Sequence, residues 1–374
     1  MSDELLPGAG GDDLAAEELA ADVDEQLRAW GAADAEIARA REAGLVALLA
    51  VAQAVMPGEA QYTERDIAER VGIDPATASR YWRALGFADV DPDDRLFTDA
   101  DADALLTVAT MIQVGLTDVE VSVQMARVLG SSMAKVAEAL LMASMSAERP
   151  DSLTELLALT AESNLETQAR LLEYVWRRHM QAAARRLLVN TEGIRDRPVY
   201  DLAVGFADLV GFTALSQQVD DRELAHIVGR FESLAFDQVA MHGGRVAKMI
   251  GDEVMFVVER PDAALDIALD LAELYADDEV LSDVRVAVAC GPVLLREGDY
   301  FGPVVNLASR IVGIALPGSV VVSESVHDTV AGDDRFKFRA LRARNLKDIG
   351  RVKLWRVRRG EPAAAPLVTR AITG

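Results

Sequence analysis

Two apolar segments in the second half of the chain each end at an aspartate, and this pattern constrains the fold more than any other. Residues 202–206 are typical of a buried strand that carries Asp208 to its end. Residues 246–250 and 253–258 are typical of two strands joined by a tight Gly-Asp turn, with Asp252 at the tip of the hairpin. A hairpin tip beside a strand end would bring the two carboxylates within reach of one cation.

The two carboxylates suit Mg²⁺ or Mn²⁺, because these hard ions take oxygen ligands and keep coordination positions open for phosphate. After Asp208 the chain turns into a predicted helix over residues 213–241, and the backbone N–H groups of residues 209–213 would form an anion site at its start. Taken singly, Asp208 also suits a helix cap and Asp252 a turn. Their combination favours a metal site beside a phosphate site.

Three motifs in this half resemble the catalytic domain of a class III nucleotidyl cyclase, over roughly residues 198–358. They are Phe-Ala-Asp-Leu-Val-Gly-Phe-Thr at 206–213, Lys-Met-Ile-Gly-Asp at 248–252 and Asp-Tyr-Phe-Gly-Pro-Val-Val-Asn-Leu-Ala-Ser-Arg at 299–310. The resemblance implies an adenylate cyclase that converts ATP to 3′,5′-cyclic AMP and pyrophosphate. The helical pattern of the first half and the order of elements in the second predict an α+β chain, in which an all-α N-terminal domain precedes a ferredoxin-like βαββαβ catalytic domain.

The apolar pattern of the second half agrees with that order of elements. It predicts strands over 200–207, 245–258 (as a hairpin), 283–290, 319–323, 336–342 and 352–357, and helices over 213–241, 261–275 and 304–315.

The resemblance gives roles to individual residues around the metal and the base. Asp208, Leu209 and Asp252 would bind two Mg²⁺ or Mn²⁺ ions per active site. Lys248 and Asp299 would read the adenine edge, because an ammonium donates to a ring nitrogen and a carboxylate accepts from the 6-amino group. Guanine presents a donor where adenine has an acceptor and an acceptor where adenine has a donor. The Lys/Asp pair therefore implies ATP as the substrate.

The remaining assigned residues would contact the ribose and the phosphates. Asn306 would orient the ribose, and Arg310, one turn later on the same helix face, would stabilise charge at the α-phosphate. Phe212, Thr213 and Lys347 would bind the substrate, Lys347 at the triphosphate. Each residue in these sets also suits an ordinary loop or surface position, and only their joint occurrence favours the site.

The resemblance further implies a head-to-tail homodimer, because in relatives the metal aspartates come from one subunit and the other groups from its partner. Two alternatives stay open at this point. A diguanylate cyclase-like enzyme is suggested by Ile-Gly-Asp-Glu at 250–253, but it leaves Asp299, Asn306 and Arg310 unexplained. A non-catalytic helix-turn-helix regulator that binds DNA is the alternative from another class.

The whole chain divides, on composition and pattern, into five predicted segments. These are an acidic flexible tail (1–34), a helical regulatory domain (35–162), a basic linker helix (163–197), the catalytic domain (198–360) and a second tail (361–374). The formal net charge of −23 argues against a partner held mainly through phosphate contacts, such as bulk DNA. Without a secretory signal or an apolar run of membrane length, we expect a cytoplasmic protein that does not bind membranes.

Residues 66–87 resemble a helix-turn-helix, whose second helix begins at Pro75 and presents Ser79, Arg80 and Arg83 as a DNA reader might. A run of aspartates follows directly and would repel a phosphate backbone. The sequence therefore favours a helix-turn-helix used as a packing unit, with DNA as an unlikely partner.

Further helices are predicted over 100–114, 117–129, 133–145 and 153–159, with glycines or prolines between them. Five methionines lie along these helices: Met111, Met125, Met133, Met142 and Met145. Methionine at helical spacing is typical of core filling, although an adaptable methionine lining also admits an apolar ligand.

Residues 165–189 form the longest helical pattern and connect the two halves through an arginine-rich helix. His179 lies on it beside two arginines, and histidine is the side chain whose ordinary pKa falls between pH 5 and 8. An apolar ligand or a pH signal is therefore our expectation for regulation, with His179 as the speculative sensor.

Overall fold

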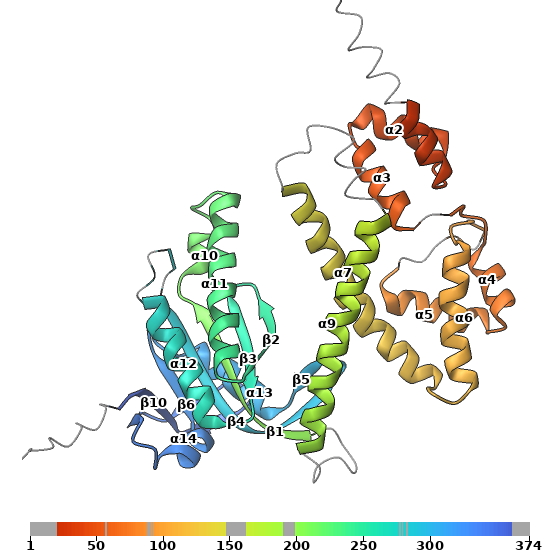
Figure 1. Ribbon diagram of the computed structural model, residues 1–374. Helices are drawn as coiled ribbons and strands as arrows, with labels where there is room; N and C mark the ends of the chain where they lie inside the picture. Colours follow the sequence, from red (N-terminus) through yellow and green to blue (C-terminus); the bar gives the residue numbers. More distant parts are fainter. Residues whose placement is uncertain are drawn as a thin grey trace, which may run out of the picture. The chain divides into compact units, whose positions relative to one another are not determined.

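The structure is a computed structural model that describes residues 21–56, 58–87, 91, 93–146, 162–189, 199–276, 278, 280–281 and 283–360. The chain divides into two compact units, Met1–Arg185 and Arg186–Gly374. Figure 1 shows helices alone in the first unit and a helix-covered sheet in the second, which confirms the predicted α+β class. None of the helices within these ranges is long and apolar enough to cross a lipid bilayer.

The helices of the first half are short except for the last two. The labelled ones are α2 (Asp34–Ala43), α3 (Val46–Val55), α4 (Glu64–Val71), α5 (Pro75–Leu85), α6 (Asp99–Gln113), α7 (Val119–Ser146) and α9 (Glu162–Val189). Residues 21–29 are helical as well, with Val23 and Leu27 buried, so this part of the segment predicted as a flexible tail (1–34) is packed. The long linker helix predicted over 165–189 is thus confirmed as α9. The predicted helix over 153–159 lies outside the described residues.

The α4–α5 pair has the predicted helix-turn-helix form, because local signals stop and start both helices. Thr63 and Asp66 cap the start of α4 reciprocally, with N···O distances of 2.9 and 3.1 Å. Gly72 ends α4 at φ +77°, a conformation that favours glycine. Asp74 then caps α5 and Pro75 occupies its first position.

The predicted break at Gly130 is wrong, since α7 runs through this residue without interruption. Gly130 instead allows α7 to approach α5 closely. A Cβ atom built at Gly130 would lie 2.1 Å from the carbonyl oxygen of Leu85, so only glycine fits the crossing of these two helices. The residue that sequence patterns treat as a helix breaker is here a contact residue.

We expect Gly130→Ala to destabilise the first unit by about 1–3 kcal/mol, because the added methyl group forces the backbones of α5 and α7 apart where they cross. Gly229→Ala is the matched control. Gly229 also lies inside a helix, α11 (Asp221–Met241), but open space surrounds its Cβ position. There alanine should stabilise by about 1 kcal/mol through helix propensity. Urea unfolding of both variants checks the pair, and equal effects would contradict the assigned contact.

The second unit is built on an eight-stranded sheet with the order β2-β3-β1-β4-β6-β10-β7, in which β5 pairs with β4. The strands are β1 (Val199–Leu209), β2 (Arg245–Ile250), β3 (Glu253–Val258), β4 (Val284–Arg296), β5 (Asp299–Phe301), β6 (Val320–Ser323), β7 (Phe336–Ala340) and β10 (Leu354–Arg359). A separate hairpin joins β8 (Arg344–Leu346) and β9 (Gly350–Val352). The order of β1 to β4 is the ferredoxin-like arrangement that was predicted.

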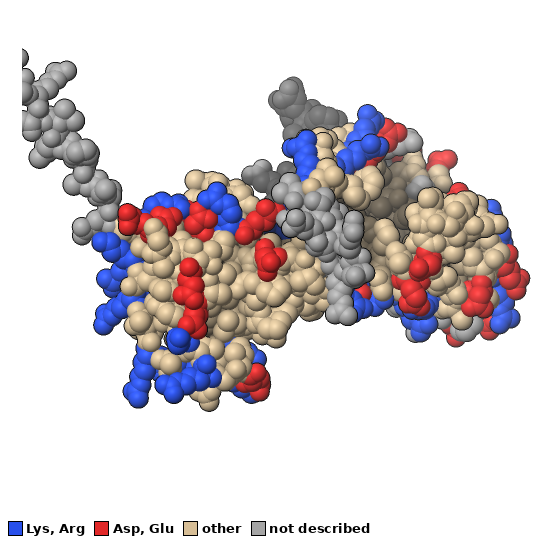
Figure 2. Space-filling view, turned by 90° about the horizontal axis from the view of Figure 1, so that it is seen from below, with Lys and Arg blue, Asp and Glu red and all other residues tan. Residues whose placement is uncertain are grey.

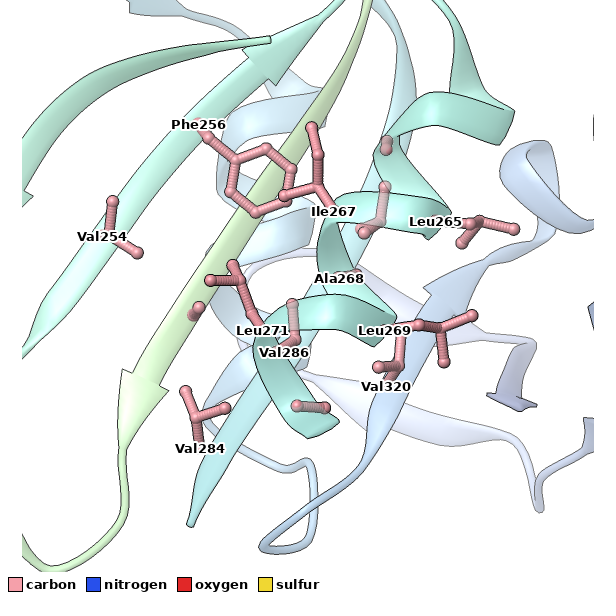
Figure 3. Close-up of a cluster of buried hydrophobic side chains, with 14 of the residues drawn as sticks. Val254, Phe256, Leu265, Ile267, Ala268, Leu269, Leu271, Val284, Val286 and Val320 are labelled. Atoms are coloured by element: carbon pink, nitrogen blue, oxygen red, sulfur yellow. The ribbon is translucent and has the colours of Figure 1, made fainter. Parts of the chain in front are cut away.

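Each face of the sheet packs against its own helices. On one face α11 and α12 (Pro261–Ala276) cover a core that contains Phe231, Phe256 and Leu265. Figure 3 shows side chains of α12 in this core together with Phe256 of β3, Val286 of β4 and Val320 of β6. On the other face α13 (Pro303–Val312) packs on Val204, Phe206 and their neighbours. The lower left of Figure 1 shows α14 (Glu324–Val330) beside β10.

Three details of the second unit differ from the prediction. The single helix expected over 213–241 is two helices, α10 (Phe212–Leu215) and α11, because Asp220 caps a new helix with its side chain. Strand β4 continues six residues beyond the predicted end at Cys290, to Arg296. The short strands β5, β8 and β9 were not predicted, since three residues are too few for a periodic signal.

Candidate active site

The predicted site residues on the strands share one face of the sheet. Side chains alternate along a strand, and Val204, Phe206 and Met255 belong to the core beneath α13. Asp208 continues the alternation of Val204 and Phe206, and Lys248 lies directly opposite Met255. Both side chains therefore lie on the α13 face.

Asp208 is held between its neighbours in the sheet at the end of β1. The register places it opposite Glu253 on β3 and opposite Arg285 on β4. Its carboxylate accepts a hydrogen bond from the Nε–H of Arg285, and only 13% of the Asp208 side chain is exposed. Asp252 follows Gly251, whose φ of +63° permits the tight turn, and its carbonyl accepts the N–H of Leu209 at 3.1 Å.

Three carboxyl groups at this strand end face a single arginine. Burial raises the pKa of Asp208, although the ion pair with Arg285 opposes the shift. Burial, together with the charges of Asp208 and Asp252, raises the pKa of Glu253 to about 7. The local excess of negative charge is what a divalent cation would relieve.

The donor set fits Mg²⁺ or Mn²⁺ better than a metal held by protein alone. Within the described residues no group of three or more His, Cys, Asp or Glu side chains is placed to hold a metal ion. The carboxylates of Asp208 and Asp252 and the main-chain oxygen of Leu209 suit Mg²⁺. In sites that handle phosphates, Mg²⁺ takes its remaining ligands from water and from the substrate phosphates. The hard oxygen donors of Asp208 and Asp252 fit that pattern.

The predicted anion site over residues 209–213 is smaller than expected. The N–H of Leu209 donates to Asp252, and the N–H of Val210 donates to the carbonyl of Asp283 at 2.9 Å. Both donors serve the fold rather than a ligand, which corrects the prediction for these two positions. Phe212 and Thr213 begin the four-residue α10, where the first N–H groups of a helix have no intrahelical acceptor.

Lys248 and Asp299 form an ion pair, although 50 residues separate them in sequence. The Nζ atom of Lys248 lies 2.6 Å from Oδ2 of Asp299, and the side chains are 37% and 35% exposed. The backbone N–H of Tyr300 donates to the second carboxylate oxygen, Oδ1, at 2.8 Å. The pair is therefore preformed and partly open to solvent, with one ammonium and one carboxylate side by side.

Asn306 and Arg310 lie one turn apart on the exposed side of α13, while Val304, Ala308 and Ile311 on its other side are buried. This spacing places both functional groups in one row, as the sequence predicted. Lys347 is exposed in the turn between β8 and β9, next to Asp348 at φ +63°.

The predicted residues thus form separate groups within one chain. Asp208 and Asp252 meet at the end of β1, and Lys248 meets Asp299. Across the described part of the chain no hydrogen bond or ion pair joins one group to the other. Arg285 is the residue that sequence reasoning missed, because a single arginine in an alternating apolar strand has no motif, and only the β1–β4 register places it beside Asp208.

In the first unit, the side chains expected to read DNA are engaged inside the unit. Arg80 forms a bidentate pair with Glu120 on α7, with both distances at 2.6 Å. The Ser79 hydroxyl donates to Glu64, and the Arg83 guanidinium to the Ser79 carbonyl at 3.3 Å. These contacts join α5 to α4 and α7 within the unit.

The four described methionines of the predicted set do not form an internal lining. Met111, Met125, Met133 and Met142 are exposed, and the side chain of Met145 lies outside the described residues. A pocket of about 210 Å³ does exist between α5, α6 and α7. Its walls combine apolar side chains such as Leu105 with the polar residues Asp74, Thr77 and Ser122, and none of these methionines lines it.

Comparison with known proteins agrees with this organisation. Residues 1–183 match the family model "Adenylate cyclase regulatory domain", and residues 195–358 match "Adenylate and Guanylate cyclase catalytic domain". An adenylate cyclase of Glutamicibacter nicotianae is 33% identical over 82% of this chain and 81% of its own length. An adenylate cyclase of Streptomyces coelicolor is 39% identical over 72% of this chain and 71% of its own length.

A third relative has a regulatory property in its name. This pH-sensitive adenylate cyclase of Mycobacterium tuberculosis is 35% identical over 84% of this chain and 82% of its own length. The similarity to all three relatives spans both units rather than the catalytic half alone. The chain therefore belongs to the class III adenylate cyclases that carry an N-terminal regulatory domain, enzymes that convert ATP to cyclic AMP.

Proposed function

We propose that Lys248 and Asp299 select ATP and that Asp208, Leu209 and Asp252 hold two Mg²⁺ or Mn²⁺ ions in this enzyme. The observation that carries the proposal is the preformed 2.6 Å Lys248–Asp299 pair on the sheet face that also bears Asp208. An adenine edge presents one acceptor and one donor to such a pair, and guanine presents the reverse. A diguanylate cyclase leaves this ion pair without a role.

The metal ions, when bound, lower the pKa of the ribose 3′-hydroxyl and neutralise charge on the triphosphate. Asn306 orients the ribose so that the 3′-hydroxyl oxygen lies in line with the α-phosphorus. Arg310 donates to the α-phosphate oxygens as charge develops there. Phe212, Thr213 and Lys347 bind the phosphate chain, and Arg285 balances the carboxylates at the end of β1.

The site is completed between two copies of the chain in this proposal. Within the described residues of one chain, no hydrogen bond or ion pair joins the aspartate group to the Lys248–Asp299 group. A head-to-tail homodimer would align the aspartates of one chain with Lys248, Asp299, Asn306 and Arg310 of its partner, and its symmetry would produce two equivalent sites.

Residues 35–162 act as the regulatory domain and residues 163–197 as the linker helix, with the catalytic domain over 198–360. A pH signal is supported by the name of the mycobacterial relative, and an apolar ligand by the 210 Å³ pocket in the first unit. His179 lies exposed on α9, whereas His242 contacts Asp270 at 2.5 Å and His327 stacks on Trp355 at 4.3 Å. Among these three, His179 is the one on the linker.

Incubation of the full chain with Mn²⁺-ATP or Mn²⁺-GTP, followed by chromatography of the products, tests the proposal. The expected product is cyclic AMP from ATP, with far less cyclic GMP from GTP. Equal use of both nucleotides would show that Lys248 and Asp299 do not read the base. A cyclic dinucleotide would identify the diguanylate alternative.

Regulation is tested by comparing the full chain with residues 190–374 between pH 5.5 and 8. We expect the two pH–activity profiles to differ, because only the full chain has the regulatory domain. His179→Ala should remove that difference, while His226→Ala, at an exposed histidine of α11, should not. Identical profiles and maximal rates for both lengths would end the regulatory proposal. A difference that survives His179→Ala would exclude this histidine as the sensor.

A further inference from the structure

The last strands of the catalytic unit are strongly basic in a strongly acidic protein. Residues 336–359 contain ten lysines and arginines and one acidic residue, Asp348, so this segment has a net charge of +9. The whole chain has a formal charge of −23, which leaves −32 for the rest (−23 − 9). So large a contrast within 24 residues indicates a surface that meets an anion.

Four of these cations lie together on one face of the sheet edge. Arg339 of β7 is directly opposite Arg356 of β10, and Lys337 is directly opposite Arg358. All four alternate with residues of the core beneath α11 and α12, such as Phe336, and so lie on the other face. We call Lys337, Arg339, Arg356 and Arg358 the basic face. Figure 2 shows Lys and Arg gathered at the left and lower edge of the catalytic unit, where Figure 1 has β10.

The four cations of the basic face have no acidic partner in the described residues, whereas three cations that lie close to them in the sequence do. Arg335 is paired with Asp262, Asp266 and Asp333, Arg359 with Asp270 and Glu273, and Lys353 with Glu324. None of the four residues of the basic face forms an ion pair within the described part of the chain. In addition, the Nε atom of Arg356 is buried and has no hydrogen-bond acceptor.

Such an arrangement is unfavourable unless an anion binds. Like charges directly opposite on neighbouring strands destabilise a sheet, and a buried guanidinium donor requires an acceptor. The four positions occupy a block of about 5 Å across the strands and about 7 Å along them. That block matches a short chain of phosphates. It is too small for the six to ten phosphate contacts typical of a DNA-binding surface.

We propose that the basic face binds a di- or triphosphate group at a site separate from the catalytic one. The separation follows from strand order, because Arg285 lies on β4, two strands from β10 and about 10 Å across the sheet. The reaction of this enzyme supplies two ligands with this chemistry, namely ATP as substrate and pyrophosphate as product. Binding of phosphates to the basic face should not require Mg²⁺. The proposed catalytic site, in contrast, binds phosphates through a metal ion.

Isothermal titration calorimetry of the full chain with pyrophosphate, in EDTA and low salt, tests the proposal. We expect one site per chain, and Arg339→Gln/Arg356→Gln/Arg358→Gln should weaken it by at least about tenfold. The matched control removes three cations that already have acidic partners, as Arg177→Gln/Arg230→Gln/Lys353→Gln. The affinity of the control for pyrophosphate should stay within about twofold of wild type, because the control removes the same net charge without changing the basic face.

If the first triple variant does not fold, Lys337→Gln/Arg358→Gln replaces it, because it alters two exposed residues only.

Parallel titrations with ATP identify the source of the phosphate group. Equal affinities for ATP and pyrophosphate would support recognition of the phosphate chain alone, and a strong preference for either would name that ligand. Binding that survives in the Arg339/Arg356/Arg358 variant overturns the proposal. So does binding that is lost in Arg285→Gln, because the anion would then occupy the catalytic site. Duplex DNA that binds the basic face while pyrophosphate gives no heat would replace the proposal with a nucleic-acid surface.

Discussion

Asp208→Ala and Arg310→Ala are each expected to lose at least about a hundredfold in cyclase activity. Their equimolar mixture is expected to recover about a quarter of the wild-type activity. Asp208 holds the metal in the proposed site, and Arg310 stabilises charge at the α-phosphate. In a shared site, a heterodimer of the two variants has one site with both defects and one site with neither. Half of the dimers in a mixture are heterodimers, and half of their sites are intact, which gives about a quarter.

The measurement is cyclic AMP formation after the variants are mixed under conditions that allow subunit exchange. Asp208→Ala mixed with Asp252→Ala is the matched control, because both defects fall in the same group and every site keeps one of them. This control should recover nothing. Recovery in both mixtures would point to contamination or refolding, and recovery in neither would place the whole site within one chain.

Lys248→Glu/Asp299→Cys is expected to lower kcat/KM for ATP by about a hundredfold and to shift the ratio of ATP to GTP use toward GTP. The substitution places an acceptor where the ammonium stood and removes the carboxylate that accepts from the 6-amino group. It also removes the 2.6 Å ion pair that is present without nucleotide. Steady-state kinetics with both nucleotides measure the effect.

The control for this double variant is another lysine–carboxylate pair of the same unit. Lys353 and Glu324 form an exposed ion pair at 2.7 Å, away from the residues assigned to the base. Lys353→Glu/Glu324→Cys should leave the ratio of ATP to GTP use unchanged. An unchanged ratio in the Lys248/Asp299 variant as well would show that the base is read by other residues.

The sequence predicted best those features that depend on nearby residues. The start of α5 at Pro75 and the β2–β3 hairpin both follow from local chemistry. The resemblance assigned Lys248 and Asp299 a shared role at the adenine edge, and it did so from three motifs in order rather than from spacing. In the structure the two side chains form an ion pair.

Features that depend on distant residues were missed. Gly130 was taken for a break because its partner, the carbonyl of Leu85, is 45 positions away in sequence. Arg285 had no signal of its own, since its role follows from the β1–β4 register. The start of α11 at Asp220 was overlooked for a different reason. The apolar pattern continues across it, and the local cap overrides the pattern.

The hydrogen bond from the Leu209 N–H to the Asp252 carbonyl has an evolutionary consequence. It joins the two acidic loops through atoms that nearly every amino acid carries, so the distance between the loops does not depend on the identity of the flanking side chains. Substitutions around the aspartates can then accumulate without moving them, except for proline at position 209, which has no N–H to donate. The hydrogen bond therefore keeps the two loops at one spacing even where the side chains around them change.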